Sequence, residues 1–287
     1  MNKHISKTYA ILGFLILFLV MGCSQNGSGH QSTEKTVYEK VLESGRIRVG
    51  YISYPPSFIK DANSGELSGI FYEVIEQAAK NMGLKPAYTE EVGWGTMIAA
   101  LNAGRVDIVV AGIWPTSTRG KKADFTNPIY YSTVRAYTKY GNGIFNGNAK
   151  RINSEDVTIS IIDGEMRSII ASSDFPNAKT RALPQTSDVS QVLLEVATGK
   201  ADVTFVEPAI AEEYISRNPG SVIPIQNVPP LRVFPNVMMV NKGETDFLSM
   251  MNIAITELVN NGYVDRIIDK YEKYPGSFER VALPYRK

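Results

Sequence analysis

The chain has 287 residues, of which 30 are lysine or arginine and 29 are aspartate or glutamate. Because this near balance leaves no basic excess to meet phosphate groups, we expect no nucleic-acid partner. His4, His30 and Cys23 are the only histidines and the only cysteine. Since all three precede the first periodic segment, the body of the chain can hold no Ser-His-Asp triad, Cys-His dyad, thiolate zinc site or disulfide. We therefore expect no metal and no cofactor.

The N-terminal segment has the pattern of a secretion signal. Residues 1–7 form a short basic segment with Lys3 and Lys7. Residues 9–20 are almost continuously apolar, and Met21-Gly22-Cys23 follows. About a dozen apolar residues are too few to cross a bilayer of roughly 30 Å, so residues 1–22 are predicted to be a signal peptide rather than a membrane span. Cys23 is either a small buried hydrophobe or the acylated first residue of a mature lipoprotein. The similarity of residues 20–23 to a bacterial lipobox favours lipidation.

A polar segment separates Cys23 from the first periodic pattern. Residues 24–36 read SQNGSGHQSTEKT, which is rich in glycine and serine and shows no apolar period. We interpret residues 23–36 as a flexible tether. The folded part is then expected to begin near Val37, outside the cytoplasmic membrane, on the periplasmic side or the outer cell surface.

From Val37 onward, predicted strands and helices alternate. In the first half they are strand 46–53, helix 69–82, strand 85–90, helix 96–103 and strand 106–111. In the second half they are strand 158–162, helix 166–173, strand 179–182, helix 189–198, strand 202–206 and helix 209–217. Two further helices fill 247–271, with a break around residues 260–262. This alternation predicts the α/β class, with two lobes that each contain a mostly parallel sheet and a ligand cleft between them.

The two halves also repeat one local pattern. A helix, a glycine, a basic residue and an apolar residue precede Asp107, and the same order precedes Asp202. Short α/β units often look alike, but the shared order favours two lobes related by pseudo-symmetry.

An ordered set of motifs runs through the chain. They are RIRVG at 46–50, YPP at 54–56, GELSG at 65–69, VGW at 92–94, LNAGRVD at 101–107, TSTR at 116–119, DFTNPIYY at 124–131 and NNGYVDRI at 260–267. With this set the chain resembles the extracellular solute-binding proteins of family 3 over about residues 37–274. These are type 2 periplasmic binding proteins that serve polar amino-acid ABC transporters. The resemblance implies that two crossover strands join the lobes, with crossings near 138–141 and 231–236, and it places residues 37–139 and 236–287 in lobe 1 and residues 140–235 in lobe 2.

The resemblance also implies a binding site. An α-amino acid offers a carboxylate, an ammonium and a side chain, which call for a guanidinium, a carboxylate and an aromatic surface. Arg119 matches the family's carboxylate-binding arginine, Thr116 matches its partner hydroxyl, and Glu207 stands where an aspartate usually takes the ammonium. Tyr54 and Trp94 match the rings that sandwich the ligand side chain. From the residues alone, Arg119 could face solvent, Glu207 could cap a helix or face solvent, and the two rings could belong to the core.

The remaining predicted ligand-binding residues are Gly112, Trp114, Gly164, Glu165 and Met166. Two residues after Gly112 the family often has a small hydroxyl residue, whereas this chain has Trp114, which adds a large apolar face with one N–H. At 164–166, where Gly-Thr-Thr is common, the acid at position 165 would repel a ligand carboxylate. These departures favour an aromatic, modified or weakly charged solute over a standard polar amino acid.

The expected function is that of a membrane-anchored solute-binding component of an ABC importer, which captures an amino-acid-like solute by hinge closure. We expect a monomer that is not an enzyme and docks on a membrane permease. The chain has no phosphate-binding loop of its own, so the ATPase would be a separate chain. Two alternatives remain open. One is an enzyme similar to cyclohexadienyl dehydratases, with Glu207 as general acid; the other is a lipoprotein that senses a solute without transport.

Overall fold

The computed structural model describes residues 35–164, 166–184 and 187–281. All the elements given below belong to one compact unit, Thr36–Lys287. The predicted signal peptide, Cys23 and nearly all of the tether lie outside the described residues. Within the described part of the chain, none of the helices combines the length and apolar character that a membrane span requires.

The first group of elements, which we call lobe 1, has a parallel sheet at its centre. Its strand order is β4–β1–β5, from β4 (Lys85–Glu91), β1 (Arg46–Tyr51) and β5 (Ile108–Ile113). In β5 the side chains alternate between two faces. Ile108 and Val110 pack towards α3 (Ile70–Asn81), α9 (Thr245–Asn260) and α10 (Tyr263–Tyr271), whereas Val109, Ala111 and Ile113 pack towards α4 (Met97–Asn102). Lobe 1 therefore has three layers.

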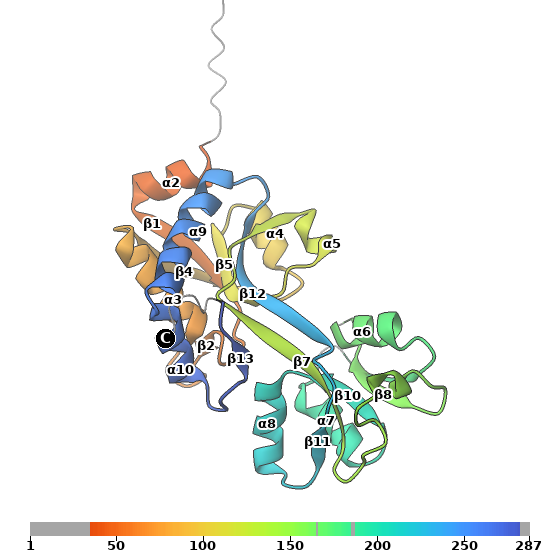
Figure 1. The fold of residues 1–287 in the computed structure, drawn as a ribbon. Coiled ribbons are helices and arrows are strands. Elements are labelled where there is room, and N and C mark those ends of the chain that lie inside the picture. Colours follow the sequence, from red (N-terminus) through yellow and green to blue (C-terminus); the bar gives the residue numbers. More distant parts are fainter. Residues whose placement is uncertain (1–34, 165, 185–186, 282–287) are drawn as a thin grey trace, which may run out of the picture. The chain divides into compact units, whose positions relative to one another are not determined.

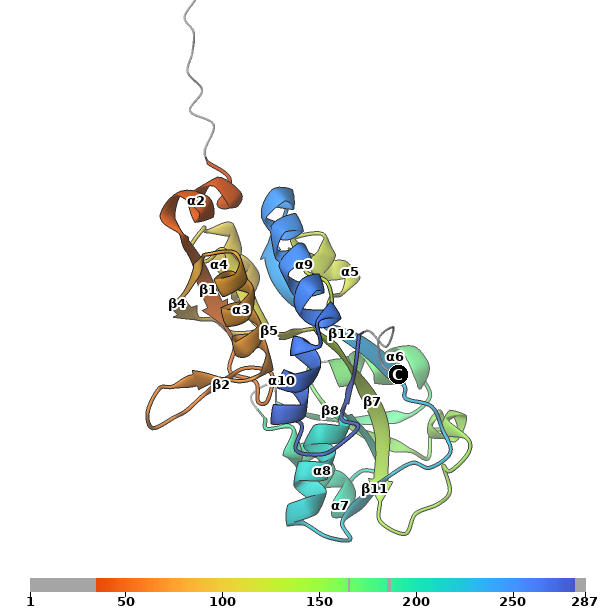
Figure 2. The same cartoon turned by 60° about the vertical axis from the view of Figure 1, so that its left-hand side comes forward.

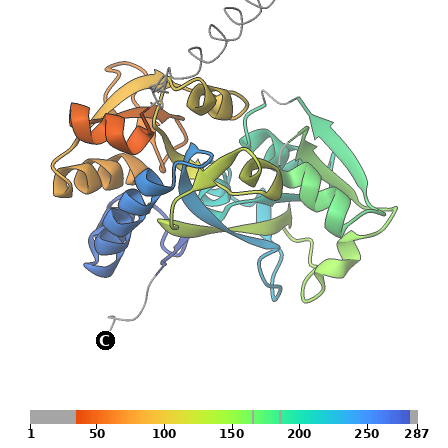
Figure 3. The same ribbon diagram turned by 90° about the horizontal axis from the view of Figure 1, so that it is seen from above.

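The helices of lobe 1 come from both ends of the chain. Figure 2 shows α9 and α10 beside α3, and Figure 3 shows the blue C-terminal helices next to the orange N-terminal ones. The first helix, α2 (Val37–Ser44), is capped by Thr36 and is joined to the start of α9, because the backbone N–H of Val37 donates to Glu244 at 2.9 Å. A two-stranded hairpin, β2 (Ile59–Lys60) and β3 (Leu67–Ser68), lies between β1 and α3.

The second group, lobe 2, repeats this arrangement. Its parallel strands follow the order β9–β8–β10, from β9 (Lys179–Leu183), β8 (Thr158–Ile162) and β10 (Val203–Val206). One face packs on α6 (Met166–Asp174), and the other packs on α7 (Ser190–Ala197) and α8 (Pro208–Arg217). The remaining elements are the 3₁₀ helix η1 (Ala149–Ile152) and β11 (Val222–Pro224).

Two ten-residue strands connect the lobes (Figure 1), namely β7 (Tyr130–Lys139) and β12 (Arg232–Asn241). They pair antiparallel from Tyr130–Asn236 to Val134–Arg232. Beyond this segment, β12 pairs with β5 and β6 (Ala123–Phe125), while β7 pairs with β10 and β11. A short C-terminal strand, β13 (Phe278–Glu279), pairs with β7 at Ser132 and Tyr131.

Two crossover strands were expected, but β7 and β12 extend beyond the short crossings predicted for them. The crossing predicted near 231–236 coincides with the paired part of β12. The one predicted near 138–141 falls at the far end of β7, where β7 already pairs with lobe 2 strands. Pro235 fits within β12 because no third strand pairs with that part of its free edge among the described residues. The exact bounds of the two lobes remain a prediction.

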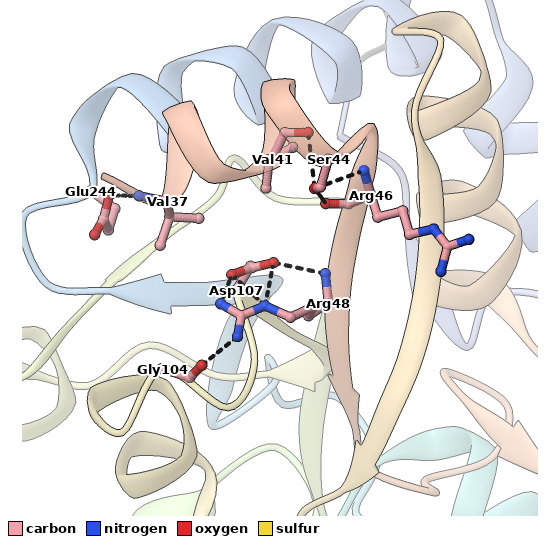
Figure 4. A network of polar contacts seen from close by, with 8 residues as sticks. All are labelled: Val37, Val41, Ser44, Arg46, Arg48, Gly104, Asp107 and Glu244. Carbon is pink, nitrogen blue, oxygen red and sulfur yellow. Dashed lines mark hydrogen bonds and ion pairs between the residues drawn. The ribbon is translucent and has the colours of Figure 1, made fainter. Parts of the chain in front are cut away.

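The hydrogen bonds of the two lobes support the predicted pseudo-symmetry. Asp107 bonds reciprocally to the backbone of Arg48, with its N–H donating to the carbonyl and its carboxylate accepting from the N–H, both at 2.8 Å. Asp202 makes the same two bonds to Thr158, also at 2.8 Å. Figure 4 shows the lobe 1 pair, in which the guanidinium of Arg48 adds further bonds to Asp107 and to the carbonyl of Gly104.

Candidate functional site

The segment after β5 holds an arginine, Arg119, that has no ion-pair partner within residues 35–164, 166–184 and 187–281. Thr116 caps the short helix α5 (Ser117–Gly120) by accepting the backbone N–H of Arg119 at 3.2 Å. The Arg119 side chain turns back and donates from Nη1 to the carbonyl of Trp114 at 2.8 Å. Burial lowers the pKa of this half-buried guanidinium, and no described carboxylate neutralises it. A partly desolvated guanidinium with donors to spare is suited to bind a carboxylate.

A second polar pair joins the two lobes. Tyr54 follows β1, and its hydroxyl donates to Oε2 of Glu207 at 2.6 Å. Burial, reinforced by the charge of Glu207, raises the pKa of Tyr54 well above its ordinary value, so the phenol stays a neutral donor. Glu207 is only 8% exposed, and although it precedes α8 its side chain makes no capping bond. Glu207 therefore occupies the N-cap position of α8 without using its side chain as a cap.

Trp94 lies against this pair. Its ring meets the ring of Tyr54 edge-on, with 5.7 Å between centroids and 84° between planes. The Trp94 side chain is 42% exposed, so it is not a core residue. The structure thus brings Tyr54, Trp94 and Glu207 together in one group, while Trp114, Thr116 and Arg119 form another.

Trp114 is bound to the crossing strand β12. Its ring stacks on Phe234 with 4.3 Å between centroids and 13° between planes. Its indole N–H donates to Oδ1 of Asn236 at 3.1 Å, so this donor is already used within the protein. Both rings pack against the apolar cluster of lobe 2.

Gly112 lies in β5 where no side chain fits. A Cβ atom at this position would stand 2.8 Å from Oγ of Ser57 and 2.9 Å from Oδ1 of Asn236. The glycine therefore lets buried polar side chains approach the end of β5 closely. The family resemblance predicted that Gly112 contacts the ligand. It did not predict that a glycine is needed here to leave space for Ser57 and Asn236.

The predicted residues at the start of α6 are only partly described. Gly164 is exposed and adopts a positive φ of 72°, which suits a glycine at the turn after β8. Met166 begins α6 and packs against the lobe 2 cluster, whereas Glu165 lies outside the described residues. The sequence analysis missed Arg167, which donates to the carbonyl of Phe205 at 2.7 Å and whose charge acts on Tyr54. Its only sequence signal was a basic side chain at a helix start.

Two surface depressions lie away from these groups. One of about 460 Å³ follows α9 beside Asn127, and one of about 690 Å³ is lined by residues of α3, the turn before β4, and Tyr263. Neither is lined by a predicted site residue. In the part of the chain that the structure describes, no cluster of three or more His, Cys, Asp or Glu side chains is arranged to hold a metal ion.

The fold and the motifs define a class of protein. The chain belongs to the bacterial extracellular solute-binding proteins, family 3, whose sequence model matches residues 47–274. The α/β fold is confirmed by solved structures of similar chains. One is an ancestral amino acid-binding protein described as a precursor of cyclohexadienyl dehydratase; it has a TM-score of 0.68 and 24% identity, and the match covers 83% of this chain and 100% of that one.

Named relatives cover nearly the whole chain. The L-cystine-binding protein TcyJ of Escherichia coli (strain K12) is 23% identical over 262 residues, which is 91% of this chain and 94% of the relative. A probable histidine-binding protein of Campylobacter jejuni is 26% identical over 267 residues, covering 92% and 97% of the two chains.

Proposed function

We propose that this protein captures a small amino-acid-like solute outside the cytoplasmic membrane and delivers it to an ABC importer. The observation that carries the proposal is Arg119, a half-buried guanidinium with no ion pair among the described residues, held beside Thr116 at the end of a parallel strand. In open α/β sheets, ligands bind beyond the carboxyl ends of the strands. Family membership and the cystine and histidine named for the relatives agree with this chemistry.

Each side chain then has a role in binding. Arg119 takes the solute carboxylate with Thr116 as second donor, and Glu207 accepts the ammonium. Tyr54 and Trp94 supply an aromatic surface for the solute side chain. The solute binds lobe 1 first, beside the Tyr54–Glu207 hydrogen bond, and bending of β7 and β12 then closes the rest of lobe 2, with the turn at Gly164, over it.

The proposal includes the attachment of the protein. Cys23 carries the lipid, residues 24–36 act as the tether, and the folded unit works as a monomer beside its permease. Two or three acyl chains on one cysteine give durable membrane attachment, whereas a single acyl chain gives only marginal binding.

The test is a thermal-shift panel of amino acids, amines and aromatic acids on the wild type and on Arg119→Ala. A solute that binds only the native state stabilises it by about 2.7 kcal/mol at a hundredfold excess over its Kd. We expect a selective rise in Tm with one class of α-amino acid, lost in Arg119→Ala while the ligand-free Tm stays close to that of the wild type. No rise with any amino acid would contradict the proposal.

The dehydratase alternative assigns Glu207 as the general acid. In the structure, Glu207 accepts a hydrogen bond from the hydroxyl of Tyr54. Turnover of prephenate by the wild type, abolished in Glu207→Gln, would support the enzyme hypothesis over solute capture.

A further inference from the structure

A buried polar network lies where the crossing strands leave lobe 1. Its centre is Asn236 in β12, which is 1% exposed. The amide of Asn236 donates to Oγ of Ser132 in β7 at 2.9 Å and to the carbonyl of Phe234 at 3.2 Å. Its Oδ1 accepts the indole N–H of Trp114 at 3.1 Å. One side chain thus joins both crossing strands to the end of β5.

A second bond extends this network towards the Tyr54 loop. Ser57 lies three residues after Tyr54, and its hydroxyl lies 2.5 Å from the hydroxyl of Tyr130, the first residue of β7. Both side chains are 1% exposed. Gly112 makes room for these groups, because a Cβ there would meet Ser57, Asn236 and Tyr130 at 3.2 Å or less.

Trp114 connects the network to Arg119. Its ring is held on two sides by β12, through the stack on Phe234 and the bond to Asn236. The backbone carbonyl of Trp114 accepts a hydrogen bond from Nη1 of Arg119 at 2.8 Å. The direction of that guanidinium therefore depends on a residue whose ring is fixed to a crossing strand.

We infer that Asn236 is a positioning residue: it fixes Trp114 to the crossing strand β12, and through Trp114 it sets the place of Arg119 relative to the hinge. The part of the inference that concerns solute binding rests on the proposed function, whereas the positioning of Trp114 does not. Asn236 itself need not touch the solute. Losing it frees the Trp114 ring and loosens Arg119, whereas losing only the Ser132 bond leaves Trp114 in place.

Tryptophan fluorescence tests this directly, because Trp94 and Trp114 are the only tryptophans in the chain. In a Trp94→Phe background the full chain, purified in mild detergent, reports Trp114 alone. We expect Asn236→Leu to shift the ligand-free emission to longer wavelength and to raise acrylamide quenching. The matched control Ser132→Ala should leave both unchanged. If Asn236→Leu does not fold, the same measurements are made on Asn236→Ser, because serine keeps a polar group at this buried position.

A second arm measures binding of L-histidine and L-cystine in the background that keeps Trp94. Loss of one buried hydrogen bond predicts about tenfold weaker binding in Asn236→Leu, through faster dissociation, and little change in Ser132→Ala. Unchanged Trp114 emission and quenching in Asn236→Leu would overturn the inference. It would also be overturned if Asn236→Leu changed the emission and quenching of Trp114 but bound the solute with wild-type affinity. If neither probe binds the wild type, the proposed function fails for these solutes, and the ligand-free arm alone decides the role of Asn236.

Discussion

At the scale of single residues, two aspartates at equivalent places in the two lobes have different surroundings. Asp107 is 2% exposed and bonds to both the backbone and the guanidinium of Arg48, as Figure 4 shows. Asp202 makes the same backbone bonds but is exposed, and its partner Thr158 has no charge. We expect Asp107→Ala to lower the free energy of unfolding by about 3 kcal/mol, because it removes a buried, charge-assisted set of bonds.

The matched control is Asp202→Ala, for which we expect a loss of about 1 kcal/mol. Urea unfolding of both variants at neutral pH measures the difference. Equal losses would show that the buried ion pair adds nothing to the backbone bonds that both sites share.

At the scale of elements, an ion pair ties α6 to the crossing strand β12. Arg232 donates to both carboxylate oxygens of Asp174, at 2.5 and 2.6 Å. The bonds from Arg232 lower the pKa of Asp174 below its ordinary value of about 3.8. Because the folded-state pKa is the lower one, this pair stabilises the fold above about pH 4, and the gain is lost as the pH falls below that.

We therefore expect Arg232→Met to flatten the acid dependence of stability. Between pH 5 and pH 3 the free energy of unfolding should fall less in the variant than in the wild type. The double variant with Asp174→Asn should match Arg232→Met over this range. Parallel curves for wild type and Arg232→Met in urea titrations would contradict the assigned role of the pair.

The elements also show what local sequence can predict. The periodic helices and the parallel strands were predicted to within a few residues, since their apolar spacing is a local property. The strand expected at 106–111 begins at Ile108, because Asp107 is occupied by its bonds to Arg48. Two crossover strands were expected, but the lengths of β7 and β12 were not predicted, because each strand is stabilised by pairing with residues about a hundred positions away.

At the scale of the whole molecule, the candidate site is formed both by residues that are close in the sequence and by residues from distant segments. Thr116 and Arg119 lie together after β5, which follows from their spacing in the sequence, while the binding roles that the family resemblance implies for them remain predictions. The resemblance could not show that Tyr54 donates to Glu207, or that Asn236 uses the N–H of Trp114, because these contacts join segments more than a hundred residues apart. The identity of the solute depends on such contacts.

The central claim is that Arg119 binds the carboxylate of an α-amino acid. The most direct measurement is a calorimetric titration of the wild type and Arg119→Ala with the amino acid that gives the largest thermal shift, and with its methyl ester. We predict that the ester binds the wild type about a hundredfold more weakly than the acid, and that Arg119→Ala binds the two with nearly equal, weak affinity. Equal affinity of the wild type for acid and ester would contradict the account, because the carboxylate would then not be the group that Arg119 recognises.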